Sequence, residues 1–97
     1  MNEYYAIIPS KVRYDKELSP NAKLIFGELV VLCQKEGFCW ASNGYFARLY
    51  GVDKRSVSRW LKQLADRGYI FFKGMDKNVD PLRQICLSPL DNFVYPP

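Results

Sequence analysis

The sequence predicts a small α+β domain that is mainly helical, and three observations indicate this class. Apolar residues recur at helical spacing over residues 20–36 and again over 54–67. A shorter stretch between them carries helix start and stop signals. Two β-prone runs, YIFFK and LRQICLS, follow and are joined by the turn-rich segment GMDKNVDP. With 97 residues, the chain is expected to form one domain around one core.

The first predicted helix covers residues 20–36. Ser19 can cap it, Pro20 suits its first position, and Gly37 fits a left-handed stop. Leu24 and Val31 fall on its outer side, where either the N-terminal arm covers them or a partner does. The residues expected to face the core are Ala22, Ile25, Phe26, Leu29, Leu32 and Cys33.

Two short β-prone runs flank this helix. Residues 4–8, closed by Pro9, are expected to form an edge strand or an extended arm, and residues 10–18 are polar and irregular. Residues 38–40 are expected to form a very short strand.

The next two predicted helices have the spacing of a helix-turn-helix. Ser42 caps Asn43–Tyr50, and Asp53 caps a helix that runs to Arg67. With Asn43 as the first position, the small residue Ala47 is fifth and Gly51 is ninth, where two helices must approach closely. The apolar anchors of this packing are Phe46, Val52, Val57 and Trp60.

A hairpin after the third helix completes the element order of a winged helix-turn-helix: three helices, a small antiparallel sheet and a β-hairpin wing. We therefore expect a winged-helix domain over residues 1–90. Residues 91–97, at the end of the proline-rich tail PLDNFVYPP, are expected to begin a linker.

The composition argues against catalysis and against a metal or other cofactor. The chain has no histidine, and its three cysteines have no CxxC spacing, so we expect reduced, mostly buried thiols. No apolar run approaches the roughly 20 residues of a membrane span, and the N-terminus lacks the pattern of a secretory signal. A cytoplasmic protein, in a bacterial host cell, is the expectation. Aromatic residues at helical or strand spacing are usually core: we expect this of Phe46, Trp60 and Phe72, and leave Tyr45 and Tyr69 open.

The net charge of +4 comes from the second part of the chain. Residues 1–42 carry five basic and five acidic side chains, whereas residues 43–97 carry nine basic and five acidic ones. A basic excess confined to one region is expected for a protein with a polyanionic partner.

The third predicted helix carries this excess on one face. Val57, Trp60, Leu61 and Leu64 form its apolar stripe, and Arg55, Ser58, Arg59 and Lys62 form a second stripe without an acidic residue. Lys54 and Arg55 stand in the first turn, where the helix dipole disfavours cations. This placement indicates an anionic partner, namely double-stranded DNA read in the major groove.

The residues therefore receive hypothetical roles. Arg55, Ser58 and Arg59 are assigned to base edges. Backbone or flanking contacts are assigned to Lys54, Lys62 and Gln63, and Ser56 belongs to the same DNA-binding set. In the wing, an ordinary charged hairpin explains the basic residues as well as DNA contact does; the candidates there are Lys73, Lys77, Asn78 and Arg83.

Three segments also carry a family resemblance: LSPNAKL, CWASN and VDKRSVSRWL, within residues 4–70. The chain resembles the N-terminal winged-helix DNA-binding domain of replication initiators and replisome organisers from phages and plasmids of Gram-positive bacteria. This resemblance implies origin binding, with oligomerisation or contacts to replication proteins made by a separate C-terminal domain that is absent from this chain.

Two alternatives stay open at this stage. The same motif serves helix-turn-helix transcriptional regulators, and some winged helices are protein-docking modules. The sequence also leaves open whether the DNA is bound by monomers, a homodimer or a higher oligomer.

Overall fold

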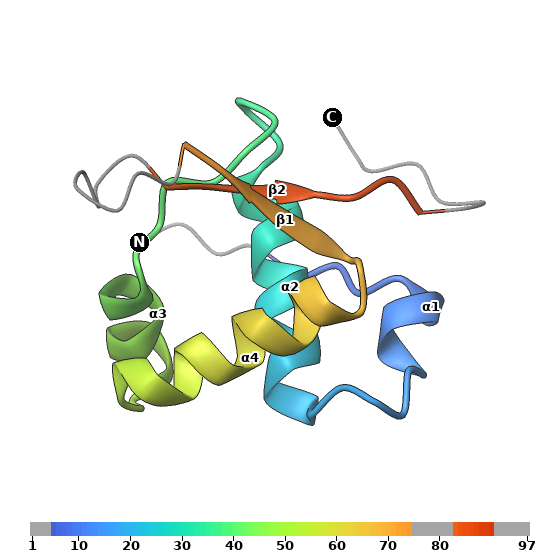
Figure 1. Ribbon diagram of the computed structural model, residues 1–97, viewed down its shortest axis with the longest axis horizontal. Coiled ribbons are helices and arrows are strands. Elements are labelled where there is room, and N and C mark those ends of the chain that lie inside the picture. The colour runs from blue at the N-terminus through green and yellow to red at the C-terminus, as the bar shows by residue number, and fades with distance from the viewer. Residues whose placement is uncertain (1–4, 75–82, 91–97) are drawn as a thin grey trace.

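The computed structural model describes residues 5–74 and 83–90 of the chain (Figure 1). Within these residues the helices are α1 (Ser10–Arg13), α2 (Pro20–Leu32), α3 (Asn43–Tyr50) and α4 (Lys54–Asp66), and the strands are β1 (Ile70–Lys73) and β2 (Gln84–Leu87). Four helices with a two-stranded antiparallel sheet make a mainly helical winged helix-turn-helix. The predicted fold class is confirmed, although α1 was not expected.

Helix α2 runs through the middle of the molecule, and α4, α1 and β2 all pack against it (Figure 1). The Ser19 hydroxyl accepts a hydrogen bond from the Ala22 N–H, and Pro20 occupies the first turn, as predicted. Of the predicted core residues only Leu32 is not fully buried; those with 5% exposure or less are Ala22, Ile25, Phe26, Leu29 and Cys33.

The predicted end of this helix was wrong, because α2 ends at Leu32 rather than just before Gly37. Cys33 is its C-cap, and the next residues form a turn that the Gly37 N–H closes on the Cys33 carbonyl at 2.8 Å. The chain then reaches the sheet, where Cys39 and Ile85 exchange two backbone hydrogen bonds of 2.9 Å each. The strand expected at residues 38–40 is reduced to this single bridge.

The described part of the predicted N-terminal strand is an extended arm that crosses α2. A glycine at position 27 permits this crossing, because a Cβ atom there would lie 2.9 Å from both Ala6 Cβ and Ile8 Cγ1. The arm covers the outer side of α2 only in part, since Leu24 remains 42% exposed. Just after the arm, the Pro9 carbonyl accepts the N–H groups of Val12 and Arg13 and so starts α1.

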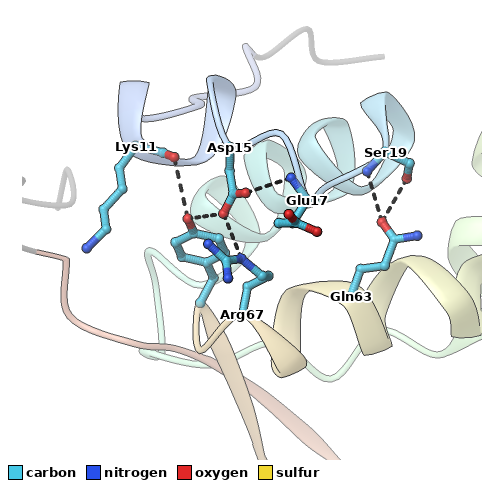
Figure 2. A network of polar contacts seen from close by, with 7 residues as sticks. Lys11, Asp15, Glu17, Ser19, Gln63 and Arg67 are labelled. Atoms are coloured by element: carbon cyan, nitrogen blue, oxygen red, sulfur yellow. Dashed lines mark hydrogen bonds and ion pairs between the residues drawn. The ribbon is translucent and has the colours of Figure 1, made fainter.

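Two polar links join the chain around α1 to α4 and the residues that follow it (Figure 2). The buried Asp15 carboxylate accepts hydrogen bonds from the Tyr69 hydroxyl at 2.5 Å and from Arg67 Nε at 3.0 Å. The Gln63 side-chain oxygen accepts two bonds of 3.0 Å, from the Ser19 N–H and the Ser19 hydroxyl. These links fix α4 against the first third of the chain.

The hairpin packs its inner residues onto the same core. Ile70 pairs with Leu87 and Phe72 with Ile85, and Ile70 and Ile85 are at most 2% exposed. Phe46 and Trp60 are buried as predicted, whereas Phe72 is partly buried against the core. All three cysteines are free and buried, and burial together with the two neighbouring thiols raises the pKa of Cys33 to about 12. No helix among the described residues is long and apolar enough to cross a membrane.

Candidate nucleic-acid interface

The turn between α3 and α4 sets the geometry of the candidate site. Helix α3 begins under the Ser42 hydroxyl, which accepts the Tyr45 N–H at 3.1 Å. It ends at Gly51, whose φ of 67° lies in the left-handed region that glycine adopts without steric cost. The Val52 N–H then bonds to the Ala47 carbonyl at 3.0 Å, so the chain reverses within one turn. The helix-turn-helix spacing read from the sequence is therefore present in the structure.

Helix α4 has one buried side and one exposed side. Val57, Trp60, Leu61 and Leu64 are at most 6% exposed and pack onto the core. The opposite side presents five exposed polar residues, which are Lys54, Arg55, Ser58, Arg59 and Lys62. The predicted stripes thus lie where the sequence placed them, and the roles assigned to the exposed residues remain predictions.

The first turn of α4 brings positive charge close to the helix cap. The Asp53 carboxylate accepts the Ser56 N–H at 2.8 Å, and this bond, with weaker effects of Arg55 and Arg59, lowers the pKa of Asp53. Arg59 donates to the Ser56 hydroxyl at 3.3 Å, which leaves Ser56 partly buried beside the cap. Among the described residues, neither Lys54 nor Arg55 forms an ion pair.

Lys62 and Gln63, further along α4, have different partners. Lys62 forms an ion pair with Asp66 at 2.9 Å, but both side chains are more than 60% exposed. Such surface pairs are weak, so Lys62 can exchange Asp66 for a phosphate at little cost. Gln63 is partly buried, and its oxygen holds the N-terminus of α2 through Ser19. Gln63 therefore has a structural partner away from the exposed stripe.

The described base of the wing contains two of the predicted residues. Lys73 is exposed, with its ammonium 5.7 Å from the centroid of the Phe71 ring. Arg83 instead reaches back to α3: its guanidinium donates to Asn43 Oδ1 at 2.8 Å and to the Ala41 carbonyl at 2.6 Å. Arg83 thus connects the wing to the start of α3. The other two wing candidates, Lys77 and Asn78, lie outside the described residues.

A basic cleft beside these residues was not predicted from the sequence. It has a volume of about 540 Å³ and lies between the start of α3, the start of α4 and the base of the wing. Its lining includes Arg48, Lys54 and Arg83, together with the exposed side chain of Trp40. Arg48 contributes to the basic excess of residues 43–97, but no sequence spacing shows that it meets Lys54. The structure supplies that information.

The described residues form no group of three His, Cys, Asp or Glu side chains that could hold a metal ion.

The comparisons with known proteins give the class of this domain. A family profile described as a helix-turn-helix domain matches residues 16–70, which is more than half of the chain. The chain therefore belongs to the helix-turn-helix domain family, whose fold typically serves DNA binding rather than catalysis. Comparisons with curated proteins and with solved structures found no match.

Proposed function

We propose that the domain binds double-stranded DNA sequence-specifically, with α4 as the helix that enters the major groove. The observation that carries this proposal is the exposed side of α4, where Lys54, Arg55, Arg59 and Lys62 surround Ser58. Of these four cations, only Lys62 forms an ion pair among the described residues, a weak surface pair with Asp66. The cations on this face outnumber the carboxylates beside them, and DNA supplies the opposite charge.

The contacts divide by position along α4. Arg55, Ser58 and Arg59 are exposed on the first two turns of α4 and are proposed to contact base edges, where arginine pairs with guanine. Lys54 and Lys62 lie at the two ends of the stripe and are proposed to contact phosphates. Gln63 is proposed to act mainly as a link between α4 and α2, because Ser19 occupies its side-chain oxygen and only its side-chain nitrogen remains to donate to a phosphate.

The wing is proposed to follow the neighbouring backbone. Lys73 is exposed at the described end of β1 and can reach a phosphate. Arg83 is proposed to act indirectly, since its bonds to Ala41 and Asn43 set the position of the wing relative to α3.

For the target, we propose a replication origin, on the strength of the resemblance carried by LSPNAKL, CWASN and VDKRSVSRWL. We further propose that residues 1–90 form the DNA-binding domain and that residues 91–97 lead into a linker. Contacts to replication proteins, and any oligomer, belong to this proposal as well.

The test is to capture fragments of the source replicon with the purified protein, at a salt concentration that suppresses non-specific binding, and to sequence the fragments retained. Clustered repeats in or beside its own gene are expected. Enrichment of scattered upstream regions would replace the origin by promoters. Retention of no fragment, together with salt-independent duplex affinity, would overturn DNA binding and favour a protein-docking module.

A further inference from the structure

The basic cleft combines two kinds of surface that the exposed side of α4 does not combine. The start of α3 lines it through Ser42, Asn43 and Gly44. The other lining residues are the cations Arg48, Lys54 and Arg83 and the aromatic residue Trp40. The cleft therefore offers cations and an aromatic surface side by side, in a volume of about 540 Å³. Small-molecule sites of roughly 300–1,000 Å³ are typical, so one nucleotide fits by size.

The cationic part lies over Gly44. A Cβ atom at this glycine would lie 3.3 Å from Lys54 Cε and 3.4 Å from Arg48 Nη1, so both side chains converge there from different helices. Neither forms an ion pair among the described residues, and no carboxylate lines the cleft. The positive end of the α3 dipole adds to the same field. Like charges that converge without a counter-charge favour an anionic group between them.

The aromatic part is exposed but held in place. Trp40 is 48% exposed, which is unusual for so large an apolar ring. Its indole N–H donates to Glu36 Oε2 at 3.2 Å, and the Phe38 ring meets it edge to face with centroids 5.0 Å apart. The ring is thus oriented before any ligand arrives. A fixed aromatic face beside cations is the combination that binds unpaired nucleotides, by stacking and phosphate contact.

We propose that this cleft binds one unpaired nucleotide of DNA next to the duplex read by α4, with its phosphate between Arg48 and Lys54 and its base stacked on Trp40. Bases within an intact duplex are covered by their neighbours in the stack, so only an unpaired base can use the Trp40 face. This inference rests on the proposed duplex binding, because the cleft adjoins the N-terminal end of α4.

The first experiment compares the affinity of the protein for a blunt duplex that carries its binding site with four duplexes extended by three unpaired thymidines. The extension is placed at the 5′ or the 3′ end of either strand, at constant salt. One of the four extensions is expected to raise the affinity about tenfold, which is the gain that stacking of one base on an aromatic ring typically gives. Trp40→Ala is expected to abolish this gain and to leave the affinity for the blunt duplex unchanged.

Two further variants separate the parts of the cleft. Trp40→Phe keeps an aromatic face and should retain most of the gain, whereas Arg48→Ala should lose it. Lys16→Ala removes an exposed lysine that does not line the cleft and serves as the charge-matched control. The chain has only two tryptophans, and Trp60 is 6% exposed, so quenching of fluorescence by a thymidine oligonucleotide reports on Trp40 directly.

The outcomes distinguish the two proposals. If the blunt duplex does not bind at all, the proposed function fails. If it binds but no extension increases the affinity, or if Trp40→Ala keeps the gain, the cleft proposal is overturned while duplex binding stands.

Discussion

The buried carboxylate of Asp15 holds three partners at once. Tyr69 and Arg67 donate to one of its oxygens, and the Glu17 N–H donates to the other at 2.9 Å (Figure 2). These bonds, with that of Tyr69 the strongest, lower the pKa of Asp15 from 3.8 to about 2. The ionised form is therefore the one that stabilises the fold.

This shift predicts acid sensitivity. A carboxyl group whose pKa is lower in the folded than in the unfolded chain stabilises the fold above its ordinary pKa, here by about 2 kcal/mol. The contribution should be lost as the pH falls from about 4 toward 2. The measurement is urea unfolding of the natural protein and of Asp15→Asn between about pH 2 and 6. The other carboxyl groups titrate in both proteins, so the difference between the two free energies of unfolding isolates the contribution of Asp15. A difference in free energy of unfolding that stays constant over this range would contradict the assignment.

At the DNA-facing side, Arg55 offers the sharpest test of base recognition. Arg55→Ala should reduce the preference for one base pair of the site by roughly 1–3 kcal/mol, while Lys16→Ala should change no preference. Competition binding with every single base-pair variant of the site gives the result. An equal loss of affinity on all sequences would make Arg55 a phosphate contact.

At the scale of elements, Gln63 links α4 to the start of α2 through Ser19. Gln63→Leu keeps the approximate size of the side chain but leaves the Ser19 N–H and hydroxyl without their acceptor. The free energy of unfolding should fall by about 1–2 kcal/mol, as measured by chemical denaturation, with duplex affinity unchanged below the melting range. Lower affinity at unchanged stability would instead restore Gln63 to the interface.

The sequence predicted the elements that depend on local signals. Helix α3 lies between its predicted caps Ser42 and Gly51, and α4 begins after its predicted cap Asp53. These positions could be predicted because caps and left-handed glycines act within a few residues. The end of α2 could not be predicted in this way, since the bridge between Cys39 and Ile85 joins segments 46 residues apart. Helix α1 was missed because its four residues are too few to show a helical period.

In the candidate site, too, features that depend on local spacing were predictable and features that depend on packing were not. The exposed stripe of α4 follows from helical spacing alone, so the sequence predicted which residues face outward. The bonds of Arg83 to Ala41 and Asn43, and the meeting of Arg48 with Lys54 over Gly44, depend on how separate elements pack. Such contacts have no signature in one sequence, so the partners of Gln63 and Arg83 within the protein could not be predicted.

For the whole molecule, the uneven charge distribution should control how affinity responds to salt. The basic excess lies in residues 43–97, which include α3, α4 and the described parts of the wing. The logarithm of the binding constant should fall linearly with the logarithm of salt concentration, and Lys54→Ala should lower the slope by about 1. Titrations of the selected duplex at several salt concentrations measure both slopes. An unchanged slope would show that Lys54 neutralises no phosphate.

Modification of the buried thiols can report how the domain opens. Cys33, Cys39 and Cys86 come from the end of α2, the bridge segment and β2, and each is at most 7% exposed. Cys33 and Cys39 belong to the core cluster, whereas Cys86 is buried outside it, opposite Phe71 in the hairpin. A thiol reagent can therefore modify Cys33 and Cys39 only when their segments separate from the core. If the domain opens as one unit, these two should be labelled at one common rate, as followed by mass spectrometry under mild denaturant. Faster labelling of Cys39 alone would show that the bridge segment opens before the end of α2.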